Sequence, residues 1–155
     1  MVKFTKKVLL QVANILTPIV CFTVLSLLSI GQGDASAIFG SGQKSLIDPI
    51  GFAFAIWGPI FLFLGIWLVY QARDLFKSVE EKIDMPYVEQ VSVFFILAVI
   101  FTSMWYGAWL YRIIWLATIS MIAYLASLII GYLRLGINLE ERSRKEFFTI
   151  VIPWS

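Results

Sequence analysis

Long apolar runs separated by short charged stretches dominate the pattern of hydrophobic and polar positions along the chain. Four of these runs cover residues 8–30, 50–72, 91–110 and 113–133. Each is close to the roughly 20 apolar residues that a helix needs to cross a bilayer. The runs do not alternate between apolar and polar positions, as strands of a membrane barrel would. The pattern therefore predicts four transmembrane helices.

A fifth apolar run, at residues 147–155, is much shorter than a bilayer span. We expect it to be a fifth transmembrane helix that has only begun in this sequence. Together the runs predict an all-α integral membrane protein. Its expected architecture is a five-transmembrane-helix bundle that forms a single membrane domain over residues 1–155.

The connections between the runs differ in character. Residues 31–48 are rich in Gly, Ser and Asp, which is typical of a binding loop or lid. Residues 73–86 carry several charges, and we expect them simply to be solvated. So few residues separate the third and fourth runs that these runs should form an antiparallel hairpin, with Arg112 at its tip. The aromatic residues expected at the membrane interface are Trp109, Tyr111 and Trp115.

Proline and small residues mark special positions within the runs. Pro18 should bend the first helix, because proline frees a backbone carbonyl. Gly58 and Gly65 give the second run a groove, and the fourth run has small residues at every fourth position. We expect both surfaces to pack within the bundle, with homodimerisation as the alternative. The small residues on the fourth run are Ala123, Ser127 and Gly131.

Composition excludes a water-soluble protein. The chain is 60% hydrophobic and 14% charged, with a mean hydropathy of +0.87, whereas soluble domains carry about 25% charged residues. The net charge of +2 is small and the basic residues flank the runs, which indicates membrane topology rather than nucleic-acid binding. The first run is much longer than the roughly 7–15-residue apolar core of a signal peptide, so we expect it to be retained.

The sequence offers little for catalysis or metal binding. It has no histidine and one cysteine, Cys21, which removes the commonest zinc ligand, the usual general base and any internal disulfide. It has no nucleophile-elbow, zinc-protease or nucleotide-binding motif. Away from their ends the runs contain no Asp, Glu, Lys or Arg, which disfavours an ion pump or a proton-coupled carrier. We therefore expect no enzymatic activity, no cofactor and no metal.

Aromatic residues are abundant, with 6 Trp, 6 Tyr and 13 Phe. Trp57 and Phe61 lie four positions apart on the second run, as Trp105 and Trp109 do on the third, so each pair shares a helix face. One interpretation is that these side chains face lipid or anchor at the interface. The other is an aromatic-lined cavity between helices for a flat apolar ligand.

Two polar residues within the runs, Asn14 and Thr102, could serve such a cavity. Hydrogen bonding between helices is the other interpretation, because polar side chains commonly tie transmembrane helices together. We expect Trp57, Phe61 and Trp105 to share one cavity, because their helix faces can converge. Trp115 should instead lie at the membrane interface.

The stretch from Asp48 to Phe61, which reads DPIGFAFAIWGPIF, resembles the second helix of the tryptophan-rich sensory protein family. That family includes the mitochondrial translocator protein. Its pattern of Gly-Pro, an apolar residue, an aromatic residue and a later glycine is matched by Gly58, Pro59, Phe61 and Gly65. Phe61 replaces the more usual tryptophan.

The resemblance extends along nearly the whole chain in architecture. Residues 105–110 are similar to the Trp-and-Phe cluster of the family's third helix, which is followed by the same abrupt turn. Pro153-Trp154-Ser155 resembles the opening of its fifth helix. Thr102 stands in place of the family's asparagine, and Tyr106 in place of its proline.

This resemblance implies a membrane sensor or carrier that binds a tetrapyrrole such as protoporphyrin or haem, and in some relatives a sterol, beneath the first loop. Because the chain lacks histidine, histidine ligation of haem iron is impossible. The ligand-binding residues that the resemblance implies are Trp57, Phe61, Trp105, Trp109 and Trp154.

Two other functions remain open from the residues themselves. A small transporter or permease component would need paired helix breaks, for which Pro18 and Pro59 are candidates. A structural membrane subunit would turn all of its aromatic residues toward lipid.

Basic residues predict the orientation, because ten of the twelve Lys and Arg residues lie on one side of the expected bundle. By the positive-inside rule the N terminus is cytoplasmic and the loop at residues 31–48 lies outside. We expect the bacterial cytoplasmic membrane as the location. The expected partners are the lipid bilayer and a hydrophobic small molecule, tetrapyrrole or sterol-like, with a possible homodimer and no nucleic acid.

The orientation can be tested with the variants Ser41→Cys and Ser78→Cys, treated on intact cells with a membrane-impermeant thiol reagent. Position 41 should be labelled, because it lies in the predicted outer loop, and position 78 should be protected. Labelling at position 78 alone would reverse the predicted orientation.

Overall fold

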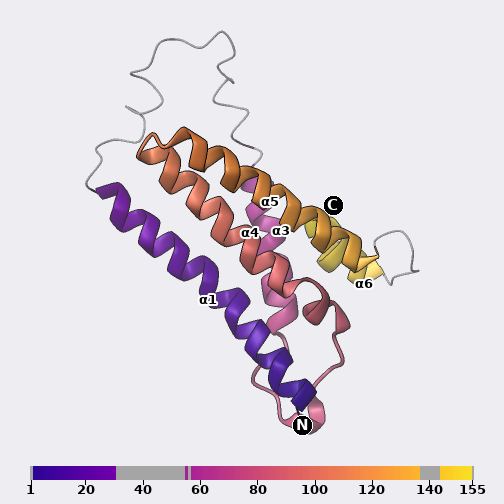
Figure 1. Cartoon of the computed structure of the whole chain (residues 1–155). Coiled ribbons are helices and arrows are strands. Elements are labelled where there is room, and N and C mark those ends of the chain that lie inside the picture. The colour runs from indigo at the N-terminus through magenta and orange to yellow at the C-terminus, as the bar shows by residue number, and fades with distance from the viewer. Residues whose placement is uncertain (1, 31–54, 56, 137–143, 155) are drawn as a thin grey trace.

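The computed structural model describes residues 2–30, 55, 57–136 and 144–154 (Figure 1). These residues contain helices and no strand, as predicted. The main helices are α1 (Val2–Ile30), α3 (Trp57–Ala72), α4 (Pro86–Leu110) and α5 (Ile114–Leu135). The shorter elements are the 3₁₀ helix η2 (Val79–Glu81), α6 (Arg144–Glu146), the π-helical η3 (Phe147–Val151) and α7 (Ile152–Trp154).

Three of these helices, α1, α4 and α5, are long and apolar enough to cross a membrane, and α3 is a shorter apolar helix. Residues 50–54 and 56 of the predicted second span lie outside the described residues, and so does the loop at residues 31–48. The predicted fifth span corresponds to a short helical segment from Arg144 to Trp154.

α1 begins at Val2, before the predicted start at residue 8, and therefore includes the basic residues at positions 6 and 7. Pro18 lies inside this helix, which continues on both sides of it. Beside the proline, the hydroxyl of Thr17 donates to the carbonyl oxygen of Ala13 at 2.7 Å. α1 is thus one continuous helix and does not show the break at Pro18 that the transporter alternative needs.

α4 begins at Pro86 rather than at residue 91, so the predicted start is wrong. Proline is favoured in the first turn of a helix, because backbone N–H groups there have no acceptor within the helix, and proline, which has no N–H, therefore loses no hydrogen bond. The additional turn brings Tyr87 and Val88 into the buried core. The charge of Glu89, on this turn, does not end the helix.

The tip between α4 and α5 confirms the predicted antiparallel hairpin. The amide of Arg112 donates to the carbonyl of Trp109 at 3.0 Å, and that of Ile113 to the carbonyl of Ala108 at 2.8 Å. These two bonds define a Schellman motif, whose turning residue adopts a left-handed conformation that favours glycine. Here that residue is Arg112, with φ of 58°.

α4 is the central helix, because it packs along α5 on one side and along α1 on the other (Figure 1). The small residues Ser127 and Gly131 are buried on α5, in agreement with the expected packing ridge. Gly58 and Gly65 differ, because a Cβ built on either would meet no atom within 4 Å. The expectation that these two glycines pack within the bundle is therefore wrong for the described residues.

The buried core lies where the end of α3, the start of α4 and the C-terminal segment meet. Trp67 of α3 and Phe95 of α4 pack with their ring centroids 4.8 Å apart. Ile150 and Val151 of η3 and Leu135 of α5 join the same cluster. This core places the C-terminal segment against α3.

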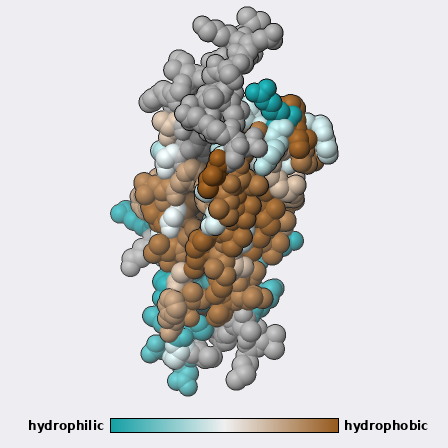
Figure 2. Space-filling view, turned by 90° about the vertical axis from the view of Figure 1, so that its left-hand side faces the viewer, coloured by the Kyte–Doolittle hydropathy of each residue, from teal (hydrophilic) through white to brown (hydrophobic). Residues whose placement is uncertain are grey.

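The outer surface is strongly apolar. Large side chains such as Phe22 on α1 and Ile114 and Ile122 on α5 are more than half exposed. Figure 2 shows a hydrophobic band over the middle of the molecule, with hydrophilic residues toward its two ends. Such a band is typical of helices that face lipid, because proteins in water rarely expose a contiguous apolar surface of this extent.

The left-handed residue in the hairpin generates a stability prediction. Arg112→Gly should stabilise the protein by about 0.5–1 kcal/mol, because the cost of a left-handed L-residue exceeds the extra backbone entropy of glycine in the unfolded chain. Thermal unfolding in detergent measures this. Arg112→Ala is the matched control, since it removes the arginine side chain but keeps the Cβ. Equal effects of the two variants would contradict the prediction.

Candidate ligand-binding groove and buried polar network

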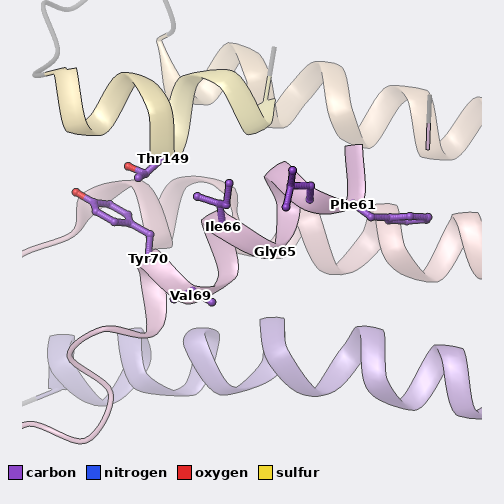
Figure 3. A pocket seen from close by; sticks show the side chains of 7 residues that line it. Phe61, Gly65, Ile66, Val69, Tyr70 and Thr149 are labelled. Atoms are coloured by element: carbon purple, nitrogen blue, oxygen red, sulfur yellow. The ribbon is translucent and has the colours of Figure 1, made fainter. Parts of the chain in front are cut away.

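An apolar groove of about 580 Å³ runs along α3, beside η3 (Figure 3). Phe61 lies toward one end, and Tyr70 and Thr149 lie close together at the other. Gly65 opens the middle, because its missing side chain leaves free space over the helix. The residues that line the groove are Phe61, Leu62, Gly65, Ile66, Val69, Tyr70 and Thr149.

The side chains that line the groove suit a ligand that is mainly apolar. Phe61 is 51% exposed, and its ring meets that of Phe22 on α1 edge to face, with centroids 6.2 Å apart. Val69, at 75% exposure, extends the apolar floor toward Tyr70. A ligand in this groove would gain mainly from the burial of apolar and aromatic surface.

Of the pocket residues predicted from the sequence, only Phe61 lines this groove among those whose side chains are described. Trp57 begins α3 and Trp154 ends α7, but their side chains lie outside the described part of the structure. Trp105 and Trp109 lie near the end of α4, where Trp105 is partly buried and Trp109 is 38% exposed.

The residues expected at the membrane interface are exposed. Tyr111 is 46% exposed at the α4–α5 hairpin, and Trp115 is 67% exposed at the start of α5. Both positions are compatible with the predicted aromatic belt at the end of the bundle. Thr102, on α4, is partly buried and does not line the groove.

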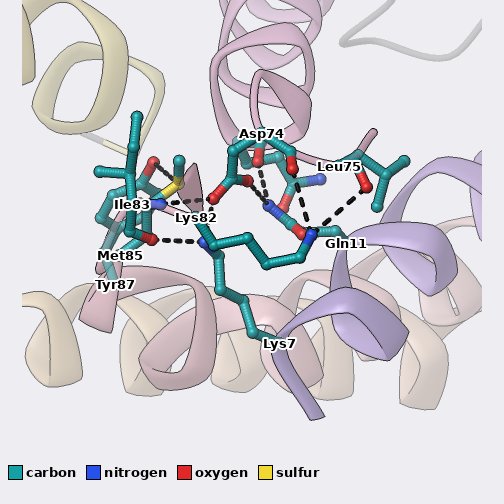
Figure 4. A network of polar contacts seen from close by, with 9 residues as sticks. Lys7, Gln11, Asp74, Leu75, Lys82, Ile83, Met85 and Tyr87 are labelled. Atoms are coloured by element: carbon teal, nitrogen blue, oxygen red, sulfur yellow. Dashed lines mark hydrogen bonds and ion pairs between the residues drawn. The ribbon is translucent and has the colours of Figure 1, made fainter. Parts of the chain in front are cut away.

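A buried polar network ties α1 to the end of α3 (Figure 4). The Lys7 ammonium donates to Asp74 Oδ2, and to the carbonyl oxygen of Ile83 at 2.5 Å. Gln11 Nε2 donates to Asp74 Oδ1 at 2.9 Å and to the carbonyl oxygen of Gln71. The amide of Ile83 donates to Asp74 Oδ2 at 3.0 Å. Asp74 thus accepts hydrogen bonds from two residues of α1 and from the connector that follows α3.

The network continues through Asn14. Its Nδ2 donates to Gln71 Oε1 and to Ser92 Oγ, each at 2.7 Å, and so joins α1 to both α3 and α4. All three residues are fully buried. Of the two interpretations of Asn14, the structure shows the interhelical hydrogen bonds, and this side chain does not line the groove.

Asp74 corrects the expectation that residues 73–86 are simply solvated, because its side chain is fully buried. Burial alone would raise the pKa of Asp74, but the hydrogen bonds from Lys7, Gln11 and Ile83 outweigh it and hold the pKa below its ordinary value. The carboxylate is therefore ionised at neutral pH, as the ion pair requires.

The sequence contains one indication of this network, a polar face on α1, which an analysis of apolar runs alone does not detect. Lys7, Gln11 and Asn14 follow one another at intervals of four and three residues, so they lie on one face of α1. A polar face at the end of an apolar helix indicates polar partners inside the protein. It does not identify those partners, which are 57–78 residues away along the chain. Within the described residues, no three metal-ligating side chains come together.

The long apolar helices and the apolar surface fit an integral membrane protein. The model of the family described as TSPO-like protein matches residues 8–155. The chain therefore belongs to the TSPO-like protein family, which confirms the resemblance to the tryptophan-rich sensory and translocator proteins. Comparisons with curated proteins and with solved structures give no match.

Removing one member of the ion pair should be costly. Asp74→Asn should destabilise the protein by about 3–5 kcal/mol, because it leaves the Lys7 charge buried without an anion. The double variant Lys7→Met with Asp74→Leu removes both charges and should cost much less. Equilibrium unfolding in detergent compares the two, and a double variant as unstable as the single one would refute the role of the ion pair.

The same carboxylate predicts a pH dependence of stability. Because the pKa of Asp74 is lower in the folded state than in the unfolded chain, its stabilising contribution is complete above about pH 4. That contribution is lost as the pH falls through the lowered pKa. Unfolding measured from pH 7 down to acid should show this loss in the wild type and not in the double variant.

Proposed function

We propose that the chain is a non-enzymatic membrane sensor or carrier that binds a flat apolar ligand of the porphyrin or haem type. The observation that carries the proposal is the groove along α3, which starts at the aromatic residue of the family-like motif and ends at Tyr70. Its volume of about 580 Å³ lies within the roughly 300–1,000 Å³ of small-molecule pockets. Membership in the TSPO-like family supports the same assignment.

The groove is extended along the axis of α3. Phe61 and Tyr70 are nine residues apart, so the apolar floor between them is about 14 Å long. We propose that a planar macrocycle rests on the apolar residues between them, where offset or edge-to-face contacts with an aromatic side chain stabilise it. Gly65 allows the ring to approach the backbone of α3.

The proposed site includes more residues than Phe61. Trp57 precedes Phe61 by one helical turn on α3, so it is proposed as the next aromatic contact. Trp154, in the C-terminal segment that packs on α3, is proposed for the opposite wall. Trp105 and Trp109 are proposed as a second aromatic wall, on α4.

The proposed location is the bacterial cytoplasmic membrane, with the N terminus in the cytoplasm. In that orientation the end of the groove at Tyr70 faces the cytoplasmic side, because α1 starts and α3 ends there. The buried ionisable residues do not point to an enzyme, since Lys7 and Asp74 are engaged with each other.

Protoporphyrin binding to the purified protein in lipid tests the proposal. The ligand should quench tryptophan fluorescence saturably, and Gly65→Leu should abolish most of the quenching, because the new side chain fills the groove. Gly58→Leu is the matched control, since it makes the same change in open space on the same helix, outside the groove. No saturable quenching at micromolar porphyrin, or equal loss in both variants, would contradict the proposal.

Aromatic substitutions then locate the ligand. Phe61→Ala should weaken binding by about 1–3 kcal/mol, through the loss of an aromatic contact and the apolar area that goes with it. Trp115→Ala should leave the affinity nearly unchanged, because that side chain is exposed at the hairpin. Trp105→Ala tests whether the ligand contacts the proposed aromatic wall on α4 in addition to α3. A loss as large as that of Phe61→Ala would place the ligand against α4 as well.

A further inference from the structure

The groove is polar at one end only. From Phe61 to Val69 its lining is apolar, and its two side-chain hydroxyls belong to Tyr70 and Thr149, which lie close together (Figure 3). Porphyrins of the haem type are amphiphilic, because two propionate carboxylates extend from one edge of an apolar ring. Carboxylates are costly inside the hydrocarbon region of a bilayer, so the end of the groove at Tyr70 is where they would lie.

A positively charged residue stands beside this end. Arg73 is the first residue after α3, and its guanidinium carbon lies 3.7 Å from the centroid of the Tyr70 ring. Tyr87 of α4 is also a neighbour of that ring, stacked on it with the centroids 6.1 Å apart. The contact with the Tyr70 ring positions Arg73 beside the groove, and a guanidinium on a ring face keeps its edge N–H donors available.

Arg73 is available for an anionic ligand. Its side chain is exposed, and among the described residues it forms no ion pair. The nearest acidic residue along the chain, Asp74, is already neutralised by Lys7. Planar guanidinium groups match carboxylates through two parallel hydrogen bonds, so Arg73 suits a propionate better than a point charge would.

The C-terminal segment beside the groove begins with two basic residues and one acidic residue, Arg144, Lys145 and Glu146. Arg144 is exposed at the start of the C-terminal segment, five residues before Thr149. The acidic residue opposes an anionic ligand, but the two basic residues leave this segment with a net positive charge.

We propose that Arg73, positioned on the Tyr70 ring, binds the carboxylates of the tetrapyrrole and thereby sets its orientation in the groove. This inference rests on the proposed function and adds a residue that would select porphyrins with free carboxylates and fix their orientation. The ring lies over the apolar floor toward Phe61, and the propionates lie at Tyr70 and Thr149. Arg73 acts through one or two charge-assisted hydrogen bonds.

A comparison of protoporphyrin with its dimethyl ester tests the inference, because the two share a ring and differ in charge. Both are titrated into the full chain in bilayers of zwitterionic lipid, so that anionic head groups do not compete for Arg73. Wild type should prefer the diacid. Arg73→Gln should weaken diacid binding by about tenfold to a hundredfold, the range for hydrogen bonds to charged groups, and leave ester binding unchanged.

Two further variants sharpen the test. Lys77→Gln removes the same charge from an exposed position in the neighbouring connector, and it should leave both affinities unchanged. Arg73→Lys keeps the charge but loses the planar fork, and its diacid affinity should fall between those of wild type and Arg73→Gln. Ester binding reports in every variant whether the groove is intact.

The outcomes separate the two proposals. If wild type binds ester and diacid equally, or if Lys77→Gln weakens diacid binding as much as Arg73→Gln does, the role of Arg73 is refuted while the groove stands. If neither porphyrin binds to wild type, the proposed function fails and this inference fails with it. A selective loss of diacid binding in Arg73→Gln supports both.

Discussion

The ion pair between Lys7 and Asp74 is the constraint on which the arrangement of the helices depends. Both side chains are buried, and a buried charge without a partner would destabilise the protein by several kcal/mol. The start of α1 must therefore lie against the end of α3 and the connector that follows it. Gln11 reinforces this register through Asp74, and Asn14 extends it to α4 through Ser92.

The network and the groove use neighbouring residues of the same helical turn. Gln71 is fully buried in the network, whereas Tyr70 lines the groove. Successive residues of a helix point in different directions, so one turn can face α1 on one side and a ligand on the other. By holding that turn in place, the network positions Tyr70, and with it Arg73 on its ring. The polar interior thus supports a candidate groove that is itself mainly apolar.

The candidate site could be predicted only in part. The sequence motif identifies the helix that forms the groove, because Phe61 and Gly65 both line it. The sequence also predicts that Trp105 and Phe61 share one cavity, but only Phe61 of these two lines the groove. Spacing establishes which residues share a face of one helix, but it contains no information on how that face is turned toward its neighbours. Trp57 and Trp154 remain predictions.

The sequence by itself determined the helical class, the positions of the long helices to within a few residues, the hairpin at Arg112 and the family. Those features depend on local patterns, such as the length of an apolar run or the turn that follows it. Only the tertiary structure decided that Asp74 is buried and that Gly65 lies open rather than packed. Lys7 and Asp74 are separated by 67 residues, so their pairing depends on how whole helices pack together.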